Sequence, residues 1–109
     1  QSKLISLISG EIVDVVVDIR KDSKTYGKTF KINLSSKDHL SLFVPKGFAH
    51  GYSVLSEKAI VVYNVDNYFN QNHQSGVCYD DNYLNINWEI SNSDLIISQR
   101  DKSFKKFDW

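Results

Sequence analysis

The residue with the clearest chemical potential is His50, within the stretch FVPKGFAHGYSVLS at residues 43–56. It follows a Pro-x-Gly turn and opens a strand-like run, and strand residues two positions apart share a face. The bulky side chains of 48–54 therefore share one inward face: Phe48, His50, Tyr52 and Val54. The opposite face carries only small residues. His50 is thus predicted to point into the protein.

Two further polar side chains are predicted to face inward by the same spacing. Tyr63 does so in the run 59–65, and Asp14 does so in the run 12–18. One buried polar group is readily a structural residue, but three indicate a ligand pocket, because burial without a partner costs free energy. With Lys3 and Asp101 they could form a general acid–base pocket for proton transfer. The open alternative is a β-barrel binding domain whose polar residues satisfy one another.

Other kinds of site find little support in the sequence. The three histidines His39, His50 and His73 are scattered, without a His-x-His pair, so the sequence predicts no metal site. Cys78 is the only cysteine, and GVCYDD around it lacks the features of a nucleophile loop. No Gly-rich phosphate loop is present. We therefore expect neither a metal nor a cofactor.

Composition narrows the class of protein. The 109 residues carry a formal net charge of zero and are 41% hydrophobic, values typical of a globular protein. A neutral chain gives no reason to expect nucleic acid or an anionic membrane as a partner. No apolar run approaches the ~18 residues that a membrane helix needs. The single thiol, Cys78, fits a cytoplasmic location.

Short strand-like runs separated by turn signals dominate the chain. They lie at 3–8, 11–20, 28–34, 40–45, 50–55 and 59–65, and this spacing predicts an all-β barrel or sandwich. The segment 84–90 is ambiguous, and a short helical or irregular segment is expected near the C-terminus. No repeat or linker divides the sequence, so residues 1–109 are expected to form a single domain.

Several segments, in one order, carry a family resemblance. They are GEIVDVVVDIRKDSKTYGK, VPKGFAHGYSVLSEKA, YNVDNYF, YDDNYLNINW and LIISQRD. Together the chain resembles the dTDP-4-dehydrorhamnose 3,5-epimerase family, a metal-free group of the cupin superfamily with a jelly-roll fold. The resemblance implies epimerisation of a dTDP-linked 4-keto-6-deoxyhexose at C3, C5 or both. It also implies a place in deoxysugar and cell-surface polysaccharide biosynthesis, without a cofactor.

The resemblance assigns roles to individual positions. It implies that Tyr63 is the acid and that Asp101, in SQRD, is the partner of the base histidine. Lys3 and His50 would contact the substrate and stabilise the enolate oxygen at C4. The remaining expected substrate contacts are Asp14, Gln74 and Arg100, of which Arg100 would lie near the nucleotide phosphates.

The sequence differs from the family pattern in three places. The base histidine of the family lies in an Arg-Gly-x-His motif that precedes this segment, and the 109 residues contain no such motif. Gln74 stands where the family often has Glu, and Tyr79 where it usually has Trp. We expect the chain to be the C-terminal part of an active, homodimeric epimerase without its N-terminal strands. The alternatives are a non-catalytic sugar-nucleotide-binding relative, a 3- or 5-mono-epimerase, or a ketoisomerase on a related sugar.

Overall fold

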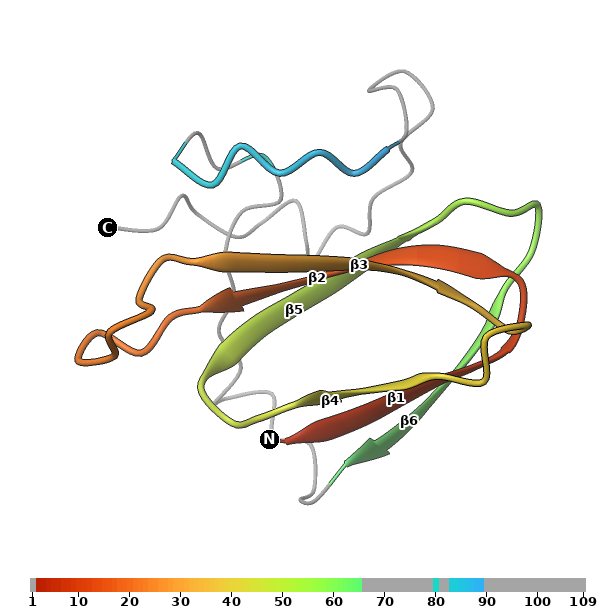
Figure 1. Ribbon diagram of the computed structural model, residues 1–109, viewed down its shortest axis with the longest axis horizontal. Helices are drawn as coiled ribbons and strands as arrows, with labels where there is room; N and C mark the ends of the chain where they lie inside the picture. The colour runs from red at the N-terminus through yellow and green to blue at the C-terminus, as the bar shows by residue number, and fades with distance from the viewer. Residues whose placement is uncertain (1, 66–79, 81–82, 90–109) are drawn as a thin grey trace.

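The computed structural model describes residues 2–65, 80 and 83–89, and this part of the chain is built from strands (Figure 1). The strands are β1 (Lys3–Ser9), β2 (Glu11–Asp18), β3 (Thr29–Ser35), β4 (Ser41–Val44), β5 (Phe48–Val54) and β6 (Ile60–Val65). Each corresponds to one of the six runs expected from the sequence. The described residues contain no helix. The short C-terminal segment expected from the sequence falls mainly on residues 90–109, outside the described part.

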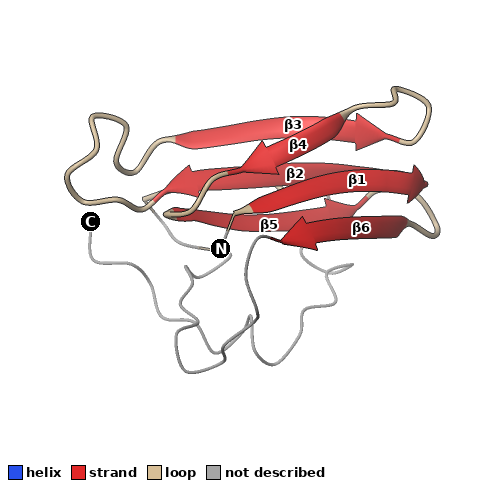
Figure 2. Ribbon diagram, turned by 90° about the horizontal axis from the view of Figure 1, so that it is seen from below, coloured by secondary structure: helices blue, strands red, loops and turns tan. Residues whose placement is uncertain are grey.

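The strands form two antiparallel sheets that lie face to face (Figure 2). One sheet has the order β4-β1-β6 and the other the order β3-β2-β5. In the first, Ile5 on β1 is paired with Tyr63 on β6. In the second, Asp14 on β2 is paired with Tyr52 on β5. The prediction of an all-β sandwich is therefore confirmed.

A small apolar core joins the two sheets. Ile5 and Val44 of the first sheet pack with Val16 of the second, and all three are buried. Leu42, Phe48 and Val61 pack around them. Because cross-strand partners share a face, the pairing puts Asp14, His50 and Tyr52 on the face that carries Val16. These three polar side chains thus lie on the same inter-sheet face as the apolar core.

The central strand β2 is buried along both of its faces. Every residue from Ile12 to Asp18 is buried, which explains its nearly continuous apolar sequence. The segment 83–89 crosses the outer face of this sheet (Figure 1). There Ser53 Oγ donates a 2.7 Å hydrogen bond to the Trp88 carbonyl oxygen. A Cβ on Gly51 would lie only 3.2 Å from the Trp88 ring, so the small residues of β5 make room for this segment.

The turn between β1 and β2 requires glycine. Gly10 has φ of +92°, a backbone conformation that side chains with a Cβ rarely adopt. A Cβ there would also lie 2.3 Å from the Lys58 carbonyl oxygen. Gly10 therefore lets the chain pass tightly from one sheet to the other.

The end expected for the second strand is wrong. The sequence run predicted a strand over 11–20, but β2 ends at Asp18. The Asp18 carboxylate accepts hydrogen bonds from the backbone N–H of Arg20 at 2.9 Å and from the Ser23 hydroxyl at 2.6 Å. These local bonds turn the chain away from the sheet, which a count of β-branched residues cannot reveal.

Candidate active site

A buried histidine–carboxylate pair lies at the centre of the candidate site. His50 Nε2 is 2.9 Å from Asp14 Oδ2 and donates a hydrogen bond to it, because an ionised carboxylate can only accept. The same nitrogen lies 2.8 Å from Oδ1, which makes no hydrogen bond of its own. The His50 side chain is 4% exposed and that of Asp14 is fully buried. Asp14 therefore lies behind His50 and holds the orientation of its ring.

Sheet register explains how this pair forms. Asp14 is directly opposite Tyr52, and His50 is directly opposite Val16. Asp14 and His50 are thus diagonal neighbours on adjacent strands, a spacing that long side chains can bridge. No described residue forms a hydrogen bond with His50 Nδ1, so the second ring nitrogen has capacity to bind a ligand.

Two tyrosine rings lie near this pair. The Tyr63 ring centroid, from the opposite sheet, is 6.4 Å from that of His50, with the rings nearly perpendicular. The Tyr52 centroid is 6.2 Å from His50 and 6.4 Å from Tyr63. The three rings therefore form a triangle between the sheets. The inward orientation predicted for His50 and Tyr63 agrees with this arrangement.

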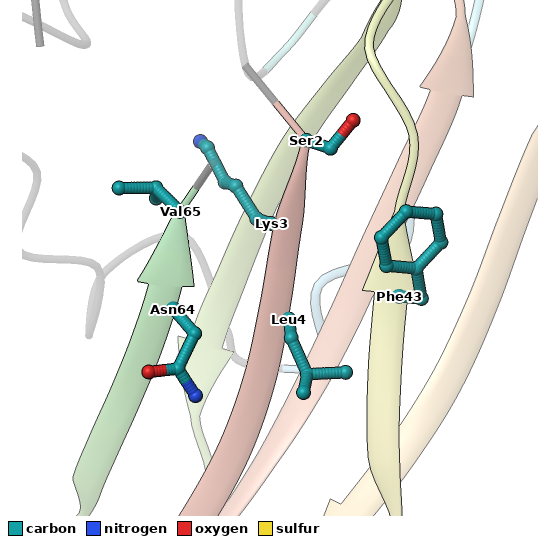
Figure 3. Close-up of a pocket in the computed structure, with 6 residues that line it drawn as sticks. All are labelled: Ser2, Lys3, Leu4, Phe43, Asn64 and Val65. Carbon is teal, nitrogen blue, oxygen red and sulfur yellow. The ribbon is translucent and has the colours of Figure 1, made fainter. Parts of the chain in front are cut away.

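Lys3 lies at the start of β1, beside a surface hollow of about 320 Å³ (Figure 3). The hollow is lined by Ser2, Lys3, Leu4, Phe43, Asn64 and Val65. Lys3 is paired across the strands with Val65 on β6, two residues after Tyr63. Figure 3 shows its side chain extending toward the side of β6, away from Phe43. Lys3 thus belongs to the same end of the first sheet as Tyr63.

Three of the expected site residues fall outside the described residues: Gln74, Arg100 and Asp101. The structure therefore brings together Asp14, His50 and Tyr63, and places Lys3 on the strand next to Tyr63. Within the described part, no three His, Cys, Asp or Glu side chains gather as metal ligands would. No described helix is long and apolar enough to cross a membrane.

Tyr52 is the residue that sequence reasoning did not select as a site residue. Its inward face was predicted from the two-residue spacing with His50, but a tyrosine on an inward face is usually part of the core. Only the position of Tyr63 on the opposite sheet shows that Tyr52 borders the same space.

Comparison with known proteins decides the family. A sequence model described as dTDP-4-dehydrorhamnose 3,5-epimerase matches residues 1–108. The chain belongs to this family. Among curated members of the dTDP-4-dehydrorhamnose 3,5-epimerase family, it is 40% identical to the Shigella flexneri protein over 107 residues. It is 42% identical over 106 residues to the protein of Methanothermobacter thermautotrophicus.

Solved structures of the family share the fold. The dTDP-4-dehydrorhamnose 3,5-epimerase of Elizabethkingia anophelis is 41% identical, with a TM-score of 0.95 over 98% of this chain. The Bacillus anthracis enzyme, solved with TDP and PPi bound, is 42% identical with a TM-score of 0.92 over 97% of this chain. The fold of this chain is therefore the cupin-like β fold of the epimerase family.

The chain corresponds to only part of these relatives. The match to the Shigella flexneri protein includes 98% of this chain but only 58% of that protein. The match to the Elizabethkingia anophelis chain likewise includes 58% of that chain. The Bacillus anthracis chain is covered to 59%. The chain thus spans somewhat more than half the length of the epimerases it matches.

Proposed function

We propose that the complete protein containing this chain epimerises a dTDP-linked 4-keto-6-deoxyhexose at C3, C5 or both. The observation that carries the proposal is the buried Asp14–His50 pair facing Tyr63 across the sandwich. A related enzyme from Legionella pneumophila, 35% identical with a TM-score of 0.91, was solved in complex with dTDP-4-keto-L-rhamnose. The match includes 96% of this chain and 55% of the Legionella pneumophila chain. That complex supports a nucleotide-linked keto sugar as the substrate.

The chemistry follows from the substrate's own carbonyl. A base histidine of the complete protein takes a proton from the carbon next to C4. The electron pair of the broken C–H bond then forms an enolate, with negative charge on the C4 oxygen. Lys3 would supply a positively charged donor at that oxygen. His50, with Nε2 donating to Asp14, would supply a second donor through Nδ1 when both of its ring nitrogens carry protons. Donors that are already oriented stabilise developing charge without reorganisation. No cofactor is needed for this step.

Reprotonation from the opposite face completes the epimerisation. A phenol is protonated at neutral pH and can donate, and the Tyr63 ring lies 6.4 Å from His50, on the other sheet. We assign Tyr63 as the acid. Asp101 is proposed to orient the base histidine, and Arg100 and Gln74 to contact the nucleotide. We further propose a homodimer in the cytoplasm, acting in dTDP-rhamnose-type deoxysugar biosynthesis.

Replacing Tyr63 with Phe in the complete protein tests the role of the acid. The ring and its packing remain, while the transferable proton is lost. Epimer formation is expected to fall by roughly 10²-fold or more, the usual scale of general acid–base catalysis. Exchange of the C3 or C5 hydrogen with deuterated solvent is expected to survive better, because enolate formation does not need this phenol. Proton NMR of the sugar measures both quantities.

Tyr83→Phe is the matched control. Tyr83 is 65% exposed and belongs to the segment that crosses the outer face of the other sheet. This variant is expected to keep parent activity. Epimerisation by Tyr63→Phe at the parent rate would show that Tyr63 is not the acid.

A further inference from the structure

We propose that Tyr52 contacts the sugar of the substrate and is a specificity-determining residue of the site. The inference rests on the proposed epimerase function and goes beyond it, because it assigns a second phenol to the site. Tyr52 would bind the sugar in the ground state beside the acid Tyr63. Three features of Tyr52 support this role. They are its position, the exposed fraction of its side chain, and a hydroxyl without a hydrogen-bond partner among the described residues.

Tyr52 lies next to the two side chains proposed to act on the substrate, His50 and Tyr63. It lies two residues after His50 on β5 and directly opposite Asp14 on β2. Its ring is 6.2 Å from His50 and 6.4 Å from Tyr63, so it is as near to the proposed acid as His50 is. A sugar that reaches Tyr63 and His50 therefore has Tyr52 beside it.

Exposure distinguishes Tyr52 from the residues of β2 on the same face. Ile12, Asp14 and Val16 on β2 are 0%, 0% and 7% exposed. Tyr52 and Tyr63, in contrast, are 36% and 43% exposed. The two phenols thus form the open side of the ring triangle, and the imidazole forms its closed side. A ligand entering from solvent meets the two tyrosines before it reaches the histidine.

The Tyr52 hydroxyl has no hydrogen-bond partner among the described residues. A residue that only filled space here would serve equally well as phenylalanine. A phenol at the open side of a site instead offers a donor and acceptor to a sugar hydroxyl. Its ring also provides an apolar surface for the C–H face of the hexose. Both contacts exist before the proton moves, so Tyr52 should affect binding more than chemistry.

Steady-state kinetics with a dTDP-linked 4-keto-6-deoxyhexose separate these roles. Tyr52→Phe is expected to raise KM by about 10-fold with kcat nearly unchanged, since it removes one hydrogen bond made equally in the ground and transition states. Tyr52→Leu removes the ring as well and is expected to raise KM further. Tyr63→Phe is expected to show the opposite pattern, with kcat lowered and KM nearly unchanged. Urea unfolding of each variant checks that its fold is intact.

Binding of dTDP alone provides an internal control, because it lacks the sugar. Its affinity is expected to be the same in parent and in both Tyr52 variants. If the parent turns over substrate and both variants keep the parent KM, Tyr52 is a packing residue and the inference is wrong. A loss of kcat without a change in KM would also contradict a ground-state contact. A parent protein that turns over no dTDP-linked keto sugar would instead overturn the proposed function, and this inference with it.

Discussion

At the scale of single residues, the pair formed by Asp14 and His50 is the most constrained feature of the site. Both side chains are almost completely buried, and Nε2 lies within 2.9 Å of both carboxylate oxygens. A carboxylate placed in such a position is costly unless a partner compensates for its lost hydration. The pair therefore fixes the orientation of the imidazole, and Asp14 has no exposed surface of its own.

Replacing Asp14 with Asn tests this coupling in the complete protein. The amide keeps the shape but loses the charge-assisted hydrogen bond, so the free energy of unfolding is expected to fall by about 1.5–3 kcal/mol. Urea denaturation of Asp14→Asn, His50→Gln and the double variant forms a mutant cycle. A coupling energy above ~0.5 kcal/mol is expected for residues in contact. Strictly additive effects would mean that the pair contributes nothing as a unit.

At the scale of elements, hydrogen bonds to the Asp18 carboxylate stabilise the loop between β2 and β3. Its carboxylate is 2% exposed and accepts bonds from Arg20, Ser23 and Thr25. The Arg20 guanidinium in turn lies 4.6 Å above the Phe48 ring, at the start of the strand that carries His50. A Cβ on Gly47 would lie 2.8 Å from the Arg20 side chain, so glycine makes room for this contact. The loop thus supports the beginning of β5.

The pH dependence of stability reports on this loop. The hydrogen bond from Arg20, followed by those from Ser23 and Thr25, holds the pKa of Asp18 well below its usual range, although burial opposes the shift. A depressed pKa in the folded state stabilises the protein above the unfolded pKa, and the contribution fades as pH falls below it. Stability of the parent is therefore expected to decline below about pH 4, where an unfolded Asp takes up a proton.

Asp18→Asn removes this titration. At neutral pH the variant is expected to be less stable than the parent, because its amide cannot replace the carboxylate's charged hydrogen bonds. The difference should narrow as the pH is lowered from about 5 toward 3, the range in which the unfolded carboxyl titrates. Urea midpoints across that range measure it. Asp22→Asn, in the same loop, serves as the control. A constant gap between parent and Asp18→Asn would contradict the assignment.

At the scale of the whole molecule, the outer face of the β4-β1-β6 sheet exposes several apolar side chains. Leu4 lies opposite Phe43 in the register of β1 and β4. The exposed apolar residues of this sheet face are Leu4, Ile8, Phe43 and Ile60. Several exposed apolar side chains on one sheet face are typical of a face that another surface covers. It supports the proposed homodimer.

Phe43→Glu tests this surface in the complete protein. Phe43 is 60% exposed, so the substitution should leave the fold intact while placing a charge on the proposed interface. Sedimentation velocity is expected to show a shift from dimer toward monomer. Tyr83→Glu, in the segment that crosses the outer face of the other sheet and 65% exposed, is the matched control and should remain dimeric. An unchanged dimer with Phe43→Glu would place the interface elsewhere.

The sequence by itself determined the elements and the faces of their side chains. Six strand runs and the inward orientation of His50 and Tyr63 follow from a two-residue period, which is a local property of the backbone. The resemblance carried by VDIRKDSKTYGK and PKGFAHGYSVLSE also pointed to the family that the comparisons show. Local patterns were sufficient for these conclusions because each depends on neighbours within a few positions.

Only the tertiary structure decided which side chains meet. Asp14 and His50 are 36 positions apart, and their contact depends on the register between β2 and β5. The approach of Tyr63 to Tyr52 depends on how two separate sheets pack, and the end of β2 depends on side-chain bonds around Asp18. A period-2 pattern is compatible with many pairings, because it specifies a face and not a partner. The partner is chosen by burial in the assembled sandwich, where an unpaired carboxylate would be too costly to retain.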